Sequence, residues 1–216
     1  MTMAGLRFQL PPKGVLRPND EHDPLPYYYH RWVGWLYRHR LQMGLDLLPA
    51  GGRRVLEVGV GSGVLVPTLT ARYAENTGTD LTLAPGLDAL VAPGCKAEFR
   101  RADLLADDLP AGHFDAIVCF SVLEHIADSA GAARGLARAL VPGGTLVCGY
   151  PMVSPLMSRA FSLIGYQGID NHHVSPPAKI AAALAGALTP LARAAFPPAA
   201  PVPAALYQCT AWTKRA

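Results

Sequence analysis

Charged residues are scarce in this chain of 216 residues, at 16%, and the basic ones do not gather into a block. The 19 lysines and arginines are scattered along the sequence, and the formal net charge is only +3. Proteins that follow a phosphate backbone concentrate their basic residues in one patch, so nucleic acid is not an expected partner. Hydrophobic residues make up 50% of the chain, which excludes disorder throughout and suffices for the core of one domain.

Long uninterrupted hydrophobic runs are also missing. The most apolar tract, residues 180–207, is broken by Arg193 and five prolines, so no membrane-spanning segment is expected. Residues 1–11 lack the basic and then apolar residues of a secretory signal sequence. The cysteines are Cys95, Cys119, Cys148 and Cys209. They show neither a CxxC spacing nor an accompanying histidine pattern, so we expect reduced thiols in a cytoplasmic protein and no bound metal.

Alternating strand-like and helix-like segments predict the fold class. Residues 1–27 are polar and rich in proline, which predicts an irregular N-terminal arm, and an apolar stripe predicts an amphipathic helix over Tyr28–Leu48. The strands expected after it are 54–58, 76–80, 97–101, 114–120, 145–150 and 206–213, and the helices are 64–73, 129–140 and 175–188. Residues 194–203 could hold a further strand or a loop. This order predicts a single domain over residues 28–216, with a doubly wound α/β fold in which helices cover both faces of a mostly parallel sheet.

A glycine-rich loop after the first expected strand carries the strongest functional signal. Glu57 is followed by glycines at alternate positions, Gly59, Gly61 and Gly63. Glycine permits a positive φ and the close approach of a ligand, and the free N–H groups of the next helix face that ligand. The third glycine comes one residue too early for a dinucleotide motif, and Glu57 favours a ligand with a cationic amine over one with phosphates. At this point a nicotinamide-dependent oxidoreductase stays open as the alternative.

Asp80 ends the second expected strand, 17 residues after Gly63. A carboxylate there can accept both ribose hydroxyls, which predicts a bound nucleoside without choosing between the two cofactors. Leu81 beside it would offer an apolar face to the base. The plain structural alternative for Asp80 is an aspartate in a turn at the end of a strand.

Four later segments decide between the cofactors. They are 101–104, 114–118, 121–125 and 140–146, which read RADL, FDAIV, SVLEH and LVPGGTL. In this order and spacing, residues 53–151 resemble the S-adenosyl-L-methionine (SAM)-dependent methyltransferases of the family that includes ubiquinone and sterol methylating enzymes. The resemblance implies a seven-stranded Rossmann-like sheet of three αβα layers, in the strand order 3-2-1-4-5-7-6 with the seventh strand antiparallel. Residues 206–213 are the candidate for that strand.

The resemblance also assigns cofactor contacts, position by position. The residues concerned are Glu57, Gly59, Gly61, Gly63, Asp80, Leu81, Asp103, Leu104 and Ser121. By this resemblance the glutamate and the backbone of the first two glycines would hold the methionine part, and the serine carbonyl would meet its amine. The first aspartate would hold the ribose, the leucine after it would cover the adenine face, and the second aspartate with the following amide would meet the adenine edge.

The acceptor is expected to be a small, largely apolar molecule. Related DNA- and protein-amine methyltransferases carry an (Asp/Asn)-Pro-Pro-(Tyr/Phe) turn after the fourth strand, whereas this chain has phenylalanine, serine, valine and leucine at 120–123. The segment 152–175, which would cover the acceptor, begins with many apolar residues. The expected substrate contacts are Tyr28, Met152, Phe161 and Tyr166.

Three histidines are candidates for a general base, which is needed only if the acceptor loses a proton. His125 follows the fourth expected strand, and His172 and His173 lie in the covering segment. Their ordinary alternative is packing or solvation in loops.

One helix face leaves a second functional class open. Arg31, Trp35, Arg38 and Gln42 share a side of the first expected helix, and arginine with tryptophan can rest at a lipid headgroup layer. The protein would then be a peripheral lipid or quinone methyltransferase, although a solvated helix face is the favoured interpretation.

Overall fold

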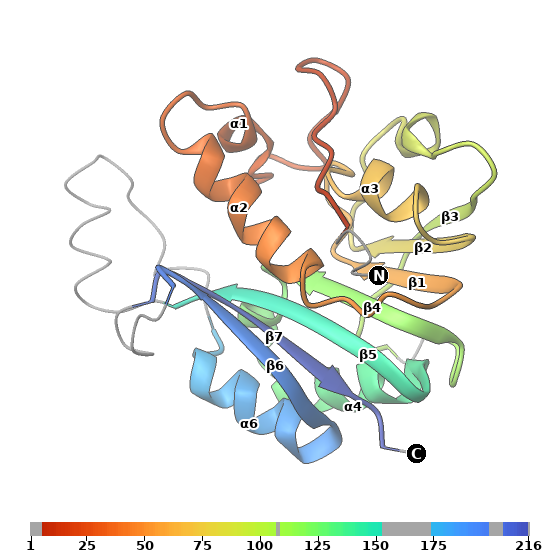
Figure 1. Ribbon diagram of the computed structural model, residues 1–216, viewed down its shortest axis with the longest axis vertical. Coiled ribbons are helices and arrows are strands. Elements are labelled where there is room, and N and C mark those ends of the chain that lie inside the picture. Colours follow the sequence, from red (N-terminus) through yellow and green to blue (C-terminus); the bar gives the residue numbers. More distant parts are fainter. Residues whose placement is uncertain (1–5, 107–108, 153–173, 199–204, 216) are drawn as a thin grey trace.

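Seven strands form one sheet in the order β3-β2-β1-β4-β5-β7-β6 (Figure 1). The computed structural model describes residues 6–106, 109–152, 174–198 and 205–215. The strands are β1 (Arg54–Val58), β2 (Glu75–Asp80), β3 (Lys96–Arg101), β4 (Phe114–Phe120), β5 (Leu140–Pro151), β6 (Thr189–Phe196) and β7 (Tyr207–Thr213). The first five run parallel, and β7 is antiparallel to β5 and β6. The predicted strand order and the antiparallel β7 are confirmed.

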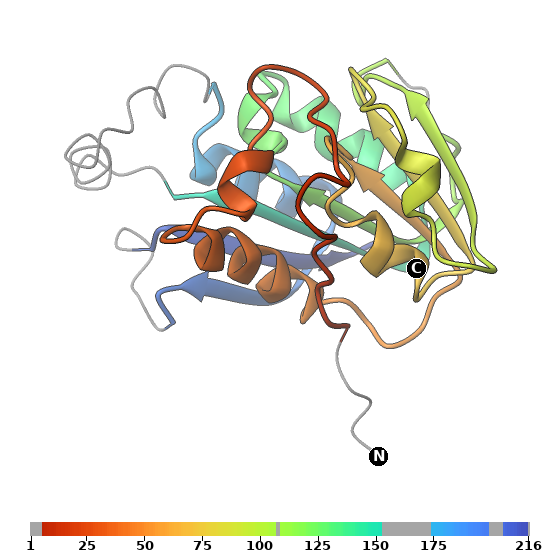
Figure 2. The same ribbon diagram turned by 90° about the horizontal axis from the view of Figure 1, so that it is seen from above.

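Helices cover both faces of this sheet, as predicted. They are α1 (Leu25–Tyr28), α2 (Gly34–Leu45), α3 (Val66–Thr70), α4 (Ser129–Ala139) and α6 (Pro177–Ala187), with the 3₁₀ turns η1 (Leu87–Leu90) and η2 (Leu123–His125). Figures 1 and 2 show α2 and α3 on one face, with α4 and α6 on the other. The chain therefore forms three layers, with the sheet in the middle.

Buried side chains form two principal clusters, one on each face of the sheet. On β1, Val55 joins the cluster under α2 and α3, while the next residue, Leu56, joins the cluster under α4 and α6. On β4, Val118 and Ile117 divide in the same way. Successive side chains of a strand point to opposite faces, so a strand buried on both faces is apolar without interruption. This explains the continuous apolar runs in the sequence.

The helix predicted over Tyr28–Leu48 is wrong in its extent, because the chain leaves the helix at residues 29–33. The ring nitrogen Nδ1 of His30 accepts hydrogen bonds from the backbone N–H groups of Trp32 at 3.2 Å and Val33 at 3.4 Å. A side chain that captures these amides competes with helical hydrogen bonding. The apolar stripe therefore belongs to two helices, α1 and α2, and α1 begins inside the predicted arm.

The sixth strand begins at Thr189, with one residue between it and the end of α6, and includes only residues 194–196 of the segment 194–203, for which the sequence left the choice between strand and loop open. Pro190 made a strand at 189–196 hard to recognise, because proline cannot donate a hydrogen bond to a neighbouring strand. In the structure β6 is the edge strand of the sheet, and proline is tolerated there because one side of the strand has no partner strand among the described residues.

The N-terminal arm, residues 6–24, has no helix or strand but is firmly packed. Its backbone N–H groups at Phe8 and Gln9 donate to Gln42 on α2 and Thr68 on α3, at 2.8 and 2.9 Å. Leu16 is buried, with 5% of its surface exposed. Figure 2 shows the arm crossing the face that α2 and α3 cover. The arm is thus an integral part of the domain.

Candidate functional site

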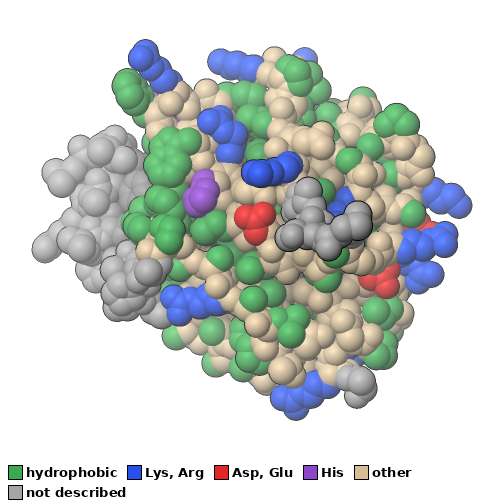
Figure 3. Space-filling view, viewed as in Figure 1, with side chains coloured by type: hydrophobic (Ala, Val, Ile, Leu, Met, Phe, Trp, Pro, Cys, Tyr) green, Lys and Arg blue, Asp and Glu red, His purple; other side chains and the backbone are tan. Residues whose placement is uncertain are grey.

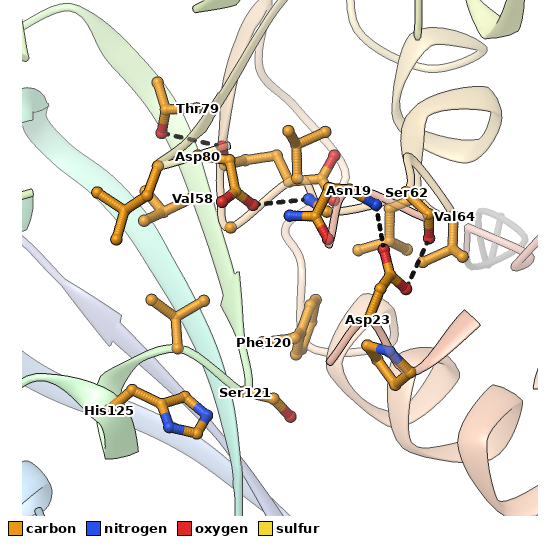
Figure 4. Close-up of a pocket in the computed structure, with 18 of the residues that line it drawn as sticks. Asn19, Asp23, Val58, Ser62, Val64, Thr79, Asp80, Phe120, Ser121 and His125 are labelled. Carbon is orange, nitrogen blue, oxygen red and sulfur yellow. Dashed lines mark hydrogen bonds between the residues drawn. The ribbon is translucent and has the colours of Figure 1, made fainter. Parts of the chain in front are cut away.

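A cavity of about 450 Å³ opens at the carboxyl ends of β1, β2 and β4 (Figure 4). The helices that follow β1 and β4 lie on opposite faces of the sheet. Between two such strands the loops diverge and leave a crevice, which is where doubly wound folds bind their ligands. The fold alone therefore places the site where the glycine loop and the loop after β4 meet.

The glycine loop is shaped by its three glycines in different ways. Gly59, Gly61 and Gly63 have φ values of +79°, +49° and +80°. A Cβ on Gly59 would lie 2.3 Å from Val122 Cγ2, so this glycine lets the loop pack against the loop after β4. Gly63 does not line the cavity, and a Cβ there would lie 2.6 Å from a methyl group of Leu87. Gly61 lines the cavity, where its bare backbone admits a ligand.

Glu57 reaches the cavity from β1 and is 4% exposed. Its Oε2 atom has no hydrogen-bond partner among the described residues. Burial, and secondly the neighbouring Asp80 carboxylate, raise the pKa of Glu57 well above its usual value. A buried carboxyl group with a free acceptor atom is best satisfied by a cationic donor from a ligand.

Asp80, at the end of β2, holds the glycine loop in place. Its Oδ2 atom accepts the backbone N–H of Gly61 at 2.8 Å, and its Oδ1 atom accepts that of Thr82 at 3.3 Å. Leu81 lines the cavity beside it and is 71% exposed. An exposed leucine at a cavity wall offers an apolar surface to a flat ring.

The other side of the cavity is formed by residues after β3 and β4. Asp103 and Leu104 line it, and Asp103 Oδ1 accepts the backbone N–H of Leu105 at 2.9 Å. Ser121 lines it with a φ of +55°, and its backbone N–H donates to the Gly149 carbonyl at 2.7 Å. His125, at the end of η2, also lines the cavity.

Arg40 is a residue of this site that the sequence did not reveal. Gly44 allows α2 to press against β4, since a Cβ there would lie 2.2 Å from the Phe120 ring, and Arg40 lies one turn earlier. The guanidinium is 4.3 Å from the centre of the Tyr37 ring and donates to the Tyr28 hydroxyl at 3.1 Å. Its Nε atom is shielded from solvent and has no partner among the described residues. The cavity lining therefore includes a cation as well as carboxylates.

The N-terminal arm also lines the cavity. Nothing in the sequence indicated that this arm would lie beside the predicted cofactor residues. The lining residues from this segment are Asn19, Asp20, His22, Asp23 and Pro24. Tyr28 lines the cavity from α1 and is 3% exposed. This part of the cavity wall depends on a tertiary contact between the arm and the glycine loop, in which Asp23 and Ser62 are 39 residues apart in sequence.

Of the described residues predicted to contact the substrate, Tyr28 lines the cavity and Met152 does not. Met152 packs in the cluster beneath α4 and α6 and is not among the residues that line the cavity. His172, His173, Phe161 and Tyr166 lie outside the described residues.

The helix face considered for a membrane surface is not continuous. Arg31 precedes α2, and Arg38 donates to the Tyr28 carbonyl at 2.8 Å. Gln42 donates to the Leu6 carbonyl at 2.8 Å, so the N-terminal arm covers the part of this helix face that Gln42 occupies. In the part of the chain described here, no helix is both long and apolar enough to traverse a bilayer.

A sheet in the order β3-β2-β1-β4-β5-β7-β6 with an antiparallel β7, and a cavity at its switch point, are typical of the class I SAM-dependent methyltransferases. The profile of a family described as a methyltransferase domain matches residues 29–188. The chain belongs to this family, and the nicotinamide alternative is set aside.

Similar proteins agree with this assignment. The chain is 31% identical over 153 residues to a ubiquinone biosynthesis O-methyltransferase of Dechloromonas aromatica, covering 68% of this chain and 62% of the relative. A protein of the same name from Paracidovorax citrulli is 38% identical over 134 residues, covering 59% of this chain and 50% of the relative. The chain thus spans only about half to three fifths of these curated relatives. Among solved structures, the N-methyltransferase NodS from Bradyrhizobium japonicum in complex with S-adenosyl-L-homocysteine shares the fold, with a TM-score of 0.63, 19% identity, and coverage of 92% and 95% of the two chains.

Proposed function

We propose that this methyltransferase acts on a small, largely apolar acceptor. The observation that carries the proposal is the cavity wall near His125, where Phe120, Val122 and Ile126 present apolar side chains. Apolar walls with few polar groups select ligands of the same character. The curated relatives are named as O-methyltransferases, which supports a hydroxyl group as the methylated position.

The charged and polar groups that line the cavity are complementary to those of SAM. We assign the cofactor amine to the unpartnered Glu57 carboxyl and the Ser121 carbonyl, and the cofactor carboxylate to the unpartnered Nε of Arg40. Asp80 would accept the ribose hydroxyls, and the backbone of the glycine loop would lie alongside the amino-acid part. Leu81 would cover the face of the adenine, and Asp103 and the Leu104 amide would meet its edge.

When bound, SAM supplies a sulfonium methyl group that a nucleophile takes by direct displacement. The main task of the protein is then to align the acceptor and to exclude water, and positioning of this kind contributes about 7 to 11 kcal/mol. His125 is our candidate to accept the proton of a hydroxyl acceptor, a step that contributes roughly 100- to 10,000-fold. A neutral amine or an electron-rich carbon would need no such base.

The acceptor class is tested by mass spectrometry after incubation with SAM. A panel of apolar phenols is compared with polar phenols of equal size and with a protein and an RNA mixture. We expect the mass of one methyl group to be gained by apolar members of the panel. Methylation confined to the polar phenols or to a macromolecule would refute the proposal.

A peripheral lipid or quinone methyltransferase is the second candidate, because two tryptophans lie at the surface. Trp32 is 70% exposed and Trp35 is 51% exposed, and the Arg31 guanidinium lies 4.7 Å from the centre of a Trp32 ring. Figure 3 shows hydrophobic side chains gathering on this side of the molecule. Tryptophan with arginine is a combination that binds at membrane interfaces.

Co-sedimentation with anionic and neutral liposomes, at low and high salt, tests this candidate. If it is right, the wild type sediments with anionic vesicles and a Trp32→Ser, Trp35→Ser double variant does not. Equal recovery of both proteins in the supernatant would leave only the small-molecule proposal.

A further inference from the structure

The N-terminal arm is hydrogen-bonded to two loops of the cofactor site, and Figure 4 shows its bond to the glycine loop. Asp23 Oδ1 accepts the hydroxyl of Ser62, which lies inside the glycine loop, at 3.2 Å. Asn19 Nδ2 donates to the carbonyl of Thr82, in the loop after β2, at 3.1 Å. Residues 19–24 therefore span the gap between the loop assigned to the methionine part and the loop assigned to the ribose and adenine.

Both ends of this span are anchored in the core. Leu16 and Leu25 are 5% and 8% exposed, and both belong to the cluster under α2 and α3. Between them, Asp23 organises the segment, because its carboxylate also accepts the backbone N–H groups of Asn19 at 3.1 Å and Leu25 at 2.8 Å. These two bonds shape the span itself, whereas the bond to Ser62 joins the span to the glycine loop.

The Asp23 carboxylate also lies close to the ligand side of the loop. A Cβ built on Gly61 would be 3.8 Å from Asp23 Oδ2. Both residues line the cavity, and Ser62 between the loop backbone and the arm is only 4% exposed. Burial raises the pKa of Asp23 above its usual value, although its three donors oppose that effect. Asp23 is thus a partly desolvated carboxylate held in the cavity wall by the fold.

We propose that residues 19–24 form a strap that closes the cofactor cavity, and that Asp23 is the positioning residue that fastens this strap to Ser62. The strap acts on cofactor retention and not on the transfer of the methyl group. A cofactor bound under it leaves only when the Asp23–Ser62 and Asn19–Thr82 bonds open. Loss of the fastening bond therefore weakens cofactor binding and raises the KM for SAM, while kcat stays near its wild-type value.

The test compares Asp23→Ala with Glu21→Ala, which also removes one carboxylate from a neighbouring position. Glu21 is a suitable control because its side chain is 85% exposed and it does not line the cavity. Calorimetry with S-adenosylhomocysteine measures the Kd, and the loss of a hydrogen bond to a charged group predicts an increase of about 10-fold for Asp23→Ala alone. An unchanged Kd in Asp23→Ala, equal to that of Glu21→Ala, would overturn the proposal.

Ser62→Ala and the Asp23→Ala, Ser62→Ala double variant show whether the two residues act through one bond. We expect the double variant to bind S-adenosylhomocysteine no more weakly than Asp23→Ala, because the shared bond can be lost only once. Hydrogen exchange in residues 17–24 gives a readout that does not depend on activity: S-adenosylhomocysteine should slow exchange there in the wild type and not in Asp23→Ala. Independent, multiplying effects of the two substitutions, with equal protection in both proteins, would contradict the strap. A wild type that fails to bind S-adenosylhomocysteine would refute the cofactor assignment itself.

Discussion

Asp80 accepts the backbone N–H of Gly61 at 2.8 Å, so the end of β2 supports the glycine loop that follows β1. This bond gives Asp80 a structural role in addition to its proposed role toward the ribose. Two substitutions separate the roles. Asparagine keeps an oxygen that can accept the Gly61 bond, whereas alanine removes it.

We expect Asp80→Asn to retain the thermal stability of the free protein and to bind S-adenosylhomocysteine at least about 10-fold more weakly. Asp80→Ala should lose the same affinity and in addition about 1 to 2 kcal/mol of unfolding free energy. Asp88→Asn, on the exposed surface of η1, is the matched control. Wild-type affinity in Asp80→Asn would show that the carboxylate serves the loop alone.

Glu57 and Arg40 should distinguish between ligands with and without an amino-acid part. Glu57→Gln and Arg40→Gln are each expected to weaken S-adenosylhomocysteine binding by about 10-fold or more, because a charge-assisted hydrogen bond is lost. Binding of methylthioadenosine, which lacks the amine and the carboxylate, should not change. Calorimetry with both ligands measures the difference, and Glu98→Gln on the exposed side of β3 is a control. A parallel loss for both ligands would mean that these residues shape the cavity and do not contact the amino acid.

Glu124 should make the stability of the protein depend on pH. It is 3% exposed, and burial raises its pKa from 4.5 to about 7. Because the folded pKa is above the unfolded one, the folded state holds its proton more firmly, and stability falls as the pH rises from 4.5 to about 7. The shift corresponds to about 3 kcal/mol, as an order of magnitude.

Glu124→Gln removes this titration. Denaturant unfolding at pH 5 and pH 8 should show a smaller loss of stability in the variant than in the wild type. The comparison cancels the contribution of Glu57, which both proteins share. Equal losses in the two proteins would indicate that the Glu124 carboxyl is not desolvated in solution.

Gly59→Ala should lower the free energy of unfolding by more than the strain of a positive φ alone accounts for. Its φ is +79°, and an added Cβ would lie 2.3 Å from Val122 Cγ2. Gly86 has a similar φ of +84° with no heavy atom within 4 Å of an added Cβ, so Gly86→Ala reports the backbone strain alone. We expect Gly59→Ala to lose about 1 to 3 kcal/mol more than Gly86→Ala in denaturant unfolding.

A second substitution identifies the source of that loss. Val122→Ala removes the methyl group that the new Cβ would meet, and should restore part of the stability of Gly59→Ala. No recovery in the double variant would place the strain elsewhere in the loop.

The sheet could be predicted from sequence because its strands are marked locally. The segments that became β1 and β4 are mostly apolar, as a strand buried on both faces requires. The cofactor loop was recognisable because consecutive residues form it. β6 was harder to find because Pro190 and a mostly exposed pattern make an edge strand resemble a loop. The break after Tyr28 depends on the His30 ring, which no periodicity reveals.

Arg40 and Asp23 were not predicted as cofactor residues for a different reason. Each reaches the cavity through packing between segments distant in sequence: α2 on β4, and the arm on the glycine loop. In the sequence, Arg40 is one basic residue on a helix and Asp23 is one acidic residue before a proline. Their roles as site residues come from tertiary contacts alone.

The position of β6 at the outer limit of the sheet affects how the protein behaves at high concentration. An unpaired strand edge is a template for pairing with a second molecule, and native proteins protect such edges with proline and charge. Pro190 and the exposed Arg193 lie on this strand. They make the free edge a poor partner for another sheet, so these two side chains help to keep separate copies of the chain from joining into a continuous β-structure.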